Sequence, residues 1–148
     1  MKQILLCLII LMISRQLFAP VSTNIIVEKL QPIRPFEKIW NAICKVESNN
    51  DSLAYCIDSN GLPSVGIAQI QESRLNDYNN QSGDSLTMND MFHPLKAKKV
   101  FIWYADKINP GDEERICREW NGGCNGMKYT STIAYYQKIR NNLCNYCK

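Results

Sequence analysis

The sequence predicts an α+β domain that is mostly α-helical, with a small β or irregular insert after the first helix. Apolar residues recur at spacings of three and four along four separate stretches, which is helical periodicity. The segment CIDSNGLPSVGIAQI (56–70) begins with turn-forming residues and then alternates, as expected for a turn followed by short strands. Residues 24–148 amount to about 125 positions, the length of one ordinary domain with a single core.

The first predicted helix runs roughly from 35 to 47. Its apolar positions are Phe36, Ile39, Trp40, Ile43 and Val46. Pro35 suits the first helical turn, and Asn49 and Asn50 can adopt the left-handed conformation that ends a helix. The sequence therefore predicts a helix with one buried face, followed directly by the β or irregular insert.

Three further helices are predicted in the second half. Pro94 opens the first of them, which ends before Asn109. Its inner face is expected to hold Leu95, Val100, Phe101, Tyr104 and Ile108. Asp112 can cap the next helix, which Gly122 and Gly123 end. Thr130 can cap the last one, where a shared face is expected to hold Ile133, Tyr136, Ile139 and Leu143.

The N-terminus resembles a secretory signal peptide, assigned to residues 1–23. Lys2 precedes an apolar run from Ile4 to Ile13 that is short for a membrane span, and small residues follow it. Pro20 disfavours cleavage directly after Ala19, so the cut is expected between residues 19 and 24. An uncleaved anchor is the alternative, and a lipoprotein through Cys7 is a weaker one. After removal no stable membrane span is expected, and the protein would be secreted or periplasmic.

The charge of the chain does not indicate nucleic-acid binding. Residues 1–23 contain two basic side chains and no acidic one, so without them the formal net charge falls from +3 to +1. Most of the apparent basicity therefore belongs to the leader, and no nucleic-acid partner is predicted.

Six cysteines remain after the leader, and in an oxidising compartment they would most simply form three disulfides. The candidates are Cys44, Cys56, Cys117, Cys124, Cys144 and Cys147. Sequence alone does not choose among the pairings. Pairs close in sequence, Cys44 with Cys56 and Cys117 with Cys124, are the simplest suggestions. A redox pair in CNYC (144–147) is an alternative, although no strand precedes it and it ends the chain.

No metal or other cofactor is predicted. A four-cysteine zinc site would include CREWNGGC (117–124), where six residues separate the cysteines, longer than usual zinc spacing. His93 is the only histidine and directly precedes a helix-opening proline, where a cap or surface role is usual. It also lacks the elbow motif of a Ser-His nucleophile pair.

Glu47 is the candidate catalytic residue. Ile43 lies four positions before Glu47, and Trp40 lies three positions before Ile43, so the Glu47 side chain shares the apolar face of the first helix. Desolvation and the negative end of the helix dipole both raise the pKa of a carboxyl placed there. A carboxyl kept protonated near neutral pH is what a general acid needs. The alternative is a structural glutamate that faces solvent or pairs with Lys45 or Arg74.

Two later segments carry residue types that suit a carbohydrate groove. In SVGIAQI (64–70), Gly66 and Ala68 would lie on one side of an extended segment and permit close approach, while the Gln69 amide could orient a sugar group. In REWNGG (118–123), Trp120 and Asn121 could stack on and hydrogen-bond a saccharide. The alternative places Trp120 in the core and uses the next glycine as a helix cap.

Together, ESNN, GIAQI and EWNGG resemble the soluble lytic transglycosylase domain of the lysozyme-like superfamily, which is akin to goose-type lysozyme. The resemblance covers roughly residues 34–143 and implies a lysozyme-like helical fold. Matched position by position, Glu47 takes the place of the catalytic acid/base. The positions implied to bind substrate are Ser48, Gly66, Ile67, Gln69, Trp120 and Asn121. The chain departs from the family pattern at Asn50, Asp51 and Ala68, and has Trp120 where tyrosine is usual.

The resemblance implies cleavage of the β-1,4 bond between N-acetylmuramic acid and N-acetylglucosamine in peptidoglycan glycan strands. Glu47 would protonate the glycosidic oxygen and then accept the proton of the muramic C6 hydroxyl, which gives a 1,6-anhydro end. A lysozyme-type hydrolase is the near alternative, with Asp51, Asp58 or Glu72 as a second carboxylate. A secreted, non-catalytic peptidoglycan-binding or assembly protein is the third, and a secretion or conjugation apparatus is a further partner class.

Overall fold

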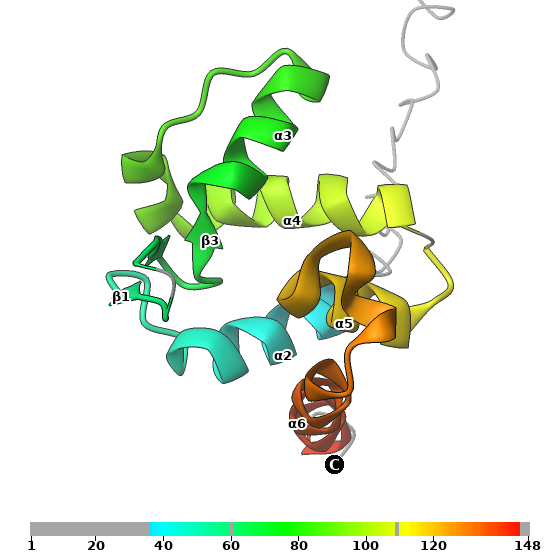
Figure 1. Cartoon of the computed structure of the whole chain (residues 1–148). Helices are drawn as coiled ribbons and strands as arrows, with labels where there is room; N and C mark the ends of the chain where they lie inside the picture. The colour runs from blue at the N-terminus through cyan, green and yellow to red at the C-terminus, as the bar shows by residue number, and fades with distance from the viewer. Residues whose placement is uncertain (1–35, 60, 109, 146–148) are drawn as a thin grey trace, which may run out of the picture. The chain divides into compact units, whose positions relative to one another are not determined.

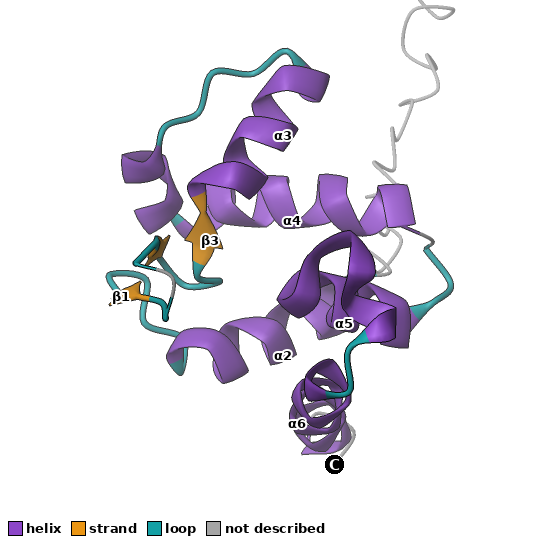
Figure 2. Ribbon diagram, viewed as in Figure 1, coloured by secondary structure: helices purple, strands orange, loops and turns teal. Residues whose placement is uncertain are grey.

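The computed structural model describes residues 36–59, 61–108 and 110–145, and the predicted signal peptide lies outside them. Helices dominate this part, and a small antiparallel sheet follows the first helix, as predicted (Figures 1 and 2). The elements are α2 (Glu37–Ser48), β1 (Tyr55–Ile57), β2 (Pro63–Val65), β3 (Ile70–Gln71), α3 (Glu72–Ser82), η1 (Met88–Phe92), α4 (Pro94–Ile108), α5 (Glu113–Gly122), η2 (Gly123–Lys128) and α6 (Ser131–Asn145). In this part of the chain, no helix is long and apolar enough to span a membrane.

Helix α2 forms and ends as the sequence predicts. Its apolar positions pack into the core, with Ile43 fully buried. Asn49 and Asn50 both adopt positive φ, 57° and 68°. The backbone N–H of Asn49 donates to the carbonyl of Lys45 at 3.2 Å and that of Asn50 to the carbonyl of Cys44 at 3.1 Å, so the helix is closed directly after Ser48.

The sheet has the order β1-β2-β3, with both pairs antiparallel. Residues 66–69 between β2 and β3 form a turn rather than the predicted extended segment, because Gly66 and Gln69 have positive φ, 76° and 49°. The close approach expected at Gly66 is present. A Cβ there would lie 2.0 Å from the carbonyl oxygen of Met91, so the turn packs directly against the backbone of η1.

Helices α4 and α5 start and end within a residue of the prediction. The Asp112 side chain accepts from the backbone N–H of Arg115, which confirms the N-cap of α5. Two inner-face predictions are wrong: Leu95 is 82% exposed and Ile133 is 40% exposed. On α4 the buried residues are Ala97, Val100, Phe101 and Ala105. Leu95 stands two positions before the first of them, where the helical rotation turns it to solvent.

Aromatic packing joins the helices around Phe101 of α4. Its ring lies 6.5 Å from that of Phe36, 5.4 Å from that of Trp40 and 5.3 Å from that of Trp120, between ring centroids. Such edge and tilted contacts stabilise a fold by about 0.5–1.5 kcal/mol per pair, beyond the free energy gained by burying the area of the rings. The start of α2 and the end of α5 are therefore packed against α4.

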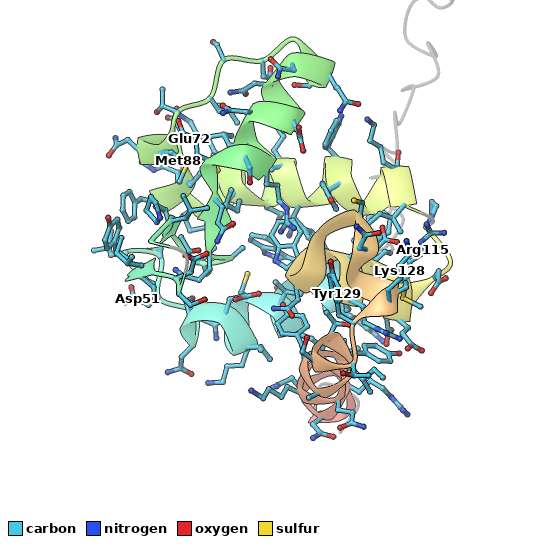
Figure 3. All side chains as sticks on the ribbon, in the orientation of Figure 1. Asp51, Glu72, Met88, Arg115, Lys128 and Tyr129 are labelled. Carbon is cyan, nitrogen blue, oxygen red and sulfur yellow. The ribbon has the colours of Figure 1, made fainter. Side chains whose placement is uncertain are left out.

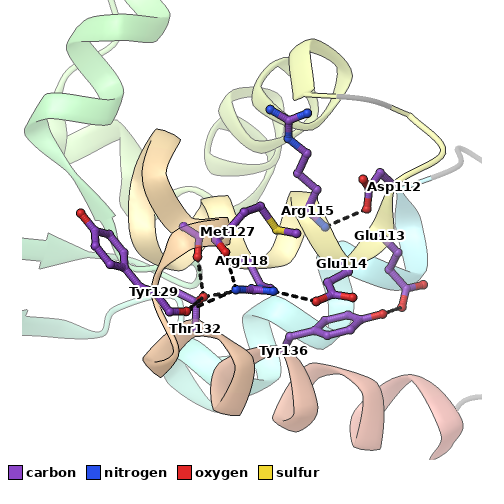
Figure 4. A network of polar contacts seen from close by, with 10 residues as sticks. Asp112, Glu113, Glu114, Arg115, Arg118, Met127, Tyr129, Thr132 and Tyr136 are labelled. Atoms are coloured by element: carbon purple, nitrogen blue, oxygen red, sulfur yellow. Dashed lines mark hydrogen bonds and ion pairs between the residues drawn. The ribbon is translucent and has the colours of Figure 1, made fainter.

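A buried arginine holds η2 against α5 (Figure 4). Arg118 donates to Thr132 Oγ1 at 3.0 Å, to Glu114 Oε1 at 2.8 Å and to the carbonyl of Met127 at 2.8 Å. The Thr132 hydroxyl in turn donates to the carbonyl of Gly126 at 2.7 Å. These bonds satisfy a buried charge and fix the segment that follows α5.

The disulfide prediction is wrong for the four cysteines whose side chains are described. Cys44, Cys56, Cys117 and Cys124 are all free thiols. The suggested pairs, Cys44 with Cys56 and Cys117 with Cys124, are therefore not bonded in the structure. The side chains of Cys144 and Cys147 lie outside the described part.

Candidate functional site

A cavity of about 710 Å³ opens between the end of α2, the sheet, α3, α4 and the end of α5. We call it the Glu47 cavity. Its lining residues are Glu47, Cys56, Ser64, Gln69, Gln71, Ser73, Arg74, Asp77, Tyr104, Trp120, Asn121, Gly122, Gly123 and Cys124. Polar side chains of several types therefore line the cavity, as is usual for a ligand site, and two of them, Glu47 and Asp77, carry a carboxyl group.

Glu47 reaches the cavity from the last turn of α2, where its side chain is partly buried. Burial raises the pKa of Glu47, and the hydrogen bond from Tyr135 and the positive charge of Arg74 oppose this rise. The predicted direction of the pKa shift is thus confirmed. A carboxyl with a raised pKa keeps its proton to higher pH, and from the protonated form it can donate to a group bound in the cavity.

The hydroxyl of Tyr135 donates to Glu47 Oε1 at 2.6 Å. Tyr135 lies on α6 and is buried. Burial and the charge of Glu47 raise the pKa of Tyr135 well above its ordinary value, so the phenol remains a donor. The sequence does not predict this contact, since the two residues stand 88 positions apart. Only the helical pattern of α6, which places the neighbouring Tyr136 inward, points to this region.

The structure brings some of the predicted site residues into the Glu47 cavity and leaves others outside its lining. Gln69, Trp120 and Asn121 line it, whereas Ser48, Gly66 and Ile67 do not. Ser48 Oγ donates to the carbonyl of Ile67 at 2.8 Å, and Gln69 Nε2 donates to that of Gly66 at 2.9 Å. These side chains therefore fix the turn between β2 and β3 against the end of α2.

Arg74 covers the indole that was expected to stack on a sugar. Trp120 is only 3% exposed, and the guanidinium of Arg74 lies 4.0 Å above its ring. Arg74 also donates to the carbonyl of Trp120 at 2.6 Å. At this wall the cavity therefore presents a guanidinium rather than an aromatic face. From the sequence, Arg74 is expected only as a possible ion-pair partner of Glu47.

The three candidate second carboxylates differ in position. Asp51 and Glu72 are exposed, one beyond the end of α2 and the other in the first turn of α3 (Figure 3). Asp58 accepts from Gln71 Nε2 at 2.9 Å and from the backbone N–H of Leu62 at 2.9 Å. Since Gln71 lines the Glu47 cavity, the Asp58 carboxylate lies one side chain behind its wall.

The described residues do not contain a group of three or more His, Cys, Asp or Glu side chains arranged to hold a metal ion. The chemistry that the described cavity offers is proton donation by Glu47, hydrogen bonding by amides and charge stabilisation by Arg74.

No known protein-family model matches the sequence, and no curated protein sequence matches it. Solved structures do match the fold. A chain in the crystal structure of Aeromonas hydrophila PliI in complex with Meretrix lusoria lysozyme aligns with a TM-score of 0.61 and 25% identity, over 71% of this chain and 88% of that one. The same values hold for the inhibitor-bound lysozyme from Meretrix lusoria. Tapes japonica lysozyme aligns with a TM-score of 0.59 and 22% identity, over 70% and 86%. The chain therefore has a lysozyme-like fold, mostly α-helical with a small sheet, and its cavity lies between that sheet and the helices.

Proposed function

We propose that this protein cleaves the β-1,4 glycosidic bond between N-acetylmuramic acid and N-acetylglucosamine in peptidoglycan, with Glu47 as the general acid. The observation that carries the proposal is a carboxyl at the wall of a large polar cavity, with its pKa raised by burial and its orientation fixed by Tyr135. The lysozymes that share the fold at up to 25% identity support the substrate class. Export to the cell envelope or beyond, by the predicted signal peptide, belongs to the same proposal.

In the proposed reaction, Glu47 donates its proton to the glycosidic oxygen as the bond to the sugar C1 breaks. The sugar then carries oxocarbenium-like positive charge, and the leaving sugar departs as a neutral alcohol. The resulting Glu47 carboxylate accepts the hydrogen bond from Tyr135 and is attracted by the charge of Arg74. Both interactions favour the ionised form and therefore strengthen as the proton leaves.

Hydrolysis is the outcome that we propose first. A lysozyme-type hydrolase uses a second carboxylate to stabilise the cation or activate water, and Asp58 lies behind Gln71 at the sheet side of the cavity. Water attacks C1 and gives up a proton to Glu47, which regenerates the acid. The lysozymes among the structural neighbours favour this outcome.

Lytic transglycosylation, the outcome implied by the sequence motifs, is the second candidate. Asp58 is not itself among the residues that line the cavity, and the attack of the muramic C6 hydroxyl on C1 needs only Glu47 as acid and base. Asp58→Asn separates the two candidates: it should greatly slow a hydrolase and leave a transglycosylase nearly as fast, and the exposed Asp51→Asn is the matched control.

The test of the proposed function is digestion of purified peptidoglycan, with mass spectrometry of the released fragments. Hydrolysis gives reducing ends, and transglycosylation gives 1,6-anhydro ends that are lighter by one water. Glu47→Gln should lower the rate by about 10²–10⁴-fold, the usual contribution of a general acid. Glu72→Gln, an exposed glutamate, should cleave at the wild-type rate. A folded wild-type protein that releases no fragments would instead support a non-catalytic binding protein.

A further inference from the structure

Arg74 forms part of the wall of the Glu47 cavity, yet it makes no ion pair with any carboxylate of the described residues. Burial lowers the pKa of Arg74, and the groups that act against this shift are Tyr104, Glu47 and Tyr135. A guanidinium remains charged in proteins, so the free energy cost of holding this charge away from water is not offset by an ion pair with a described carboxylate.

Glu47 cannot supply that anion while it acts as the acid. Before proton transfer its carboxyl is neutral, and no oxygen of Glu47 lies within ion-pair distance of Arg74. The positive charge of Arg74 therefore has no ion-pair partner among the described residues in the state that binds substrate, since the Asp77 carboxylate, which also lines the cavity, is not within ion-pair distance. A negatively charged group on the substrate would compensate it.

The guanidinium of Arg74 is held in a fixed orientation and keeps N–H donors that the protein does not use. Its Cζ atom lies against two rings that are nearly perpendicular to each other, 4.0 Å from the ring centroid of Trp120 and 4.8 Å from that of Tyr104. Nη2 donates to the carbonyls of Trp120 at 2.6 Å and Glu119 at 3.4 Å, near the end of α5 where helical carbonyls lack intrahelical partners. A guanidinium carries five N–H donors, and the contacts with these two carbonyls and with Tyr104 use at most three of them, so at least two remain for a carboxylate.

We propose that Arg74 is the anion-binding residue of the Glu47 cavity and that its ligand is a carboxylate carried by the muramoyl residue of the substrate. This inference rests on the proposed function. N-acetylmuramic acid bears a lactyl ether that ends either in a free carboxylate or in a peptide stem with its own carboxylates. N-acetylglucosamine bears no carboxylate. Arg74 thus selects strands that contain muramic acid over neutral strands built from N-acetylglucosamine alone.

The experiment measures binding to the Glu47→Gln protein, which holds substrate without cleaving it, by isothermal titration calorimetry. Three ligands of equal length are compared: a glycan with free lactyl carboxylates, the same glycan with lactyl carboxamides, and the glycan with peptide stems. The carboxylate form should bind roughly tenfold or more tightly than the carboxamide form, the value of one charge-assisted contact. If only the stem-bearing glycan binds more tightly, the bound carboxylate belongs to the peptide stem, which equally supports Arg74 as the anion-binding residue.

Variants identify the residue responsible. Adding Arg74→Gln should abolish the difference between carboxylate and carboxamide ligands, and Arg74→Lys should keep part of it. Lys107→Gln, a cation stacked 4.3 Å from the ring of Trp103 and outside the lining of the Glu47 cavity, should keep all of it. The ligand comparison with Arg74 intact gives a result even if Arg74→Gln does not fold. Equal binding of all three glycans overturns the Arg74 proposal alone. If none of the glycans binds and the wild type cleaves none of them, the proposed function is overturned as well.

Discussion

The hydroxyl of Tyr135 on the last described helix donates a 2.6 Å hydrogen bond to Glu47 at the end of the first one. This bond favours the ionised carboxyl, while burial favours the protonated one, and burial has the larger effect. The pKa of the proposed acid is therefore the balance of two opposed effects, burial at the end of α2 and a hydrogen bond from α6.

Tyr135→Phe should raise the pKa of Glu47 further, because it removes an interaction with the charged form. The acid would then remain protonated to higher pH, and the basic limb of the kcat/KM profile should move upward. Tyr136→Phe is the matched control, since that phenol donates to Glu113 at 3.3 Å instead. A profile that moves equally in both variants, or not at all in Tyr135→Phe, would contradict the role of Tyr135.

Glu47→Gln should make stability less dependent on pH. Because the folded pKa of Glu47 is raised above its unfolded value, the folded state holds its proton more tightly. The free energy of unfolding therefore falls as pH rises from the usual glutamate range through the folded pKa, and the loss is complete above it. The variant lacks this loss, so its Tm should exceed that of the wild type at pH 8, and by less at pH 4. Calorimetry at both pH values measures the difference. A variant that is less stable than the wild type at pH 8 would contradict the inference that burial of the ionised Glu47 carboxylate destabilises the fold.

Gly66→Ala should destabilise the fold far more than Gly83→Ala. Both glycines have φ near +76°, so both substitutions carry the left-handed penalty of about 1–2 kcal/mol. Only at Gly66 does the new Cβ meet the carbonyl oxygen of Met91, at 2.0 Å, which adds about 1–3 kcal/mol of overpacking. Urea denaturation of the two variants measures the difference directly. Equal losses would show that the turn is not pressed against η1.

Thiol-reactive reagents should modify Cys56 and Cys124 and spare Cys44 and Cys117. Burial raises the pKa of Cys44 to about 12 and raises that of Cys117 as well, so neither forms the reactive thiolate at neutral pH. Peptide mapping of the native protein after brief labelling with a bulky maleimide identifies the modified sites.

The two reactive thiols both line the Glu47 cavity, so labelling should also block substrate access and activity. The double variant Cys56→Ser, Cys124→Ser should be insensitive to the reagent. Rapid labelling of Cys44 in the native protein would show that the core around α2 opens readily.

The sequence was sufficient to predict the elements whose signals are local. Asn49 and Asn50 end α2, and Asp112 caps α5, because each acts on neighbouring backbone. Helix α3 was not predicted. It buries only Leu75 and Tyr78, so its sequence has no apolar stripe, and it forms because those two side chains pack on the core.

The site was less predictable than the fold, because its key contacts are long-range. The helical spacing predicted that Glu47 would lie on a partly buried face, with its pKa raised. Neither Tyr135, 88 positions away, nor the packing of Arg74 over Trp120, 46 positions away, leaves a periodic signal in the sequence. Such pairs become neighbours only when α3, α5 and α6 are packed together.

The placement of Tyr135 also sets an order of events during biosynthesis. A nascent chain that stops short of Ser131 already contains Glu47, the sheet and Arg74, but its acid has no phenol beside it. The carboxyl acquires its working environment only when α6 has left the ribosome and docked on α2. The proposed catalytic activity would thus become possible only after the rest of the described fold has been synthesised.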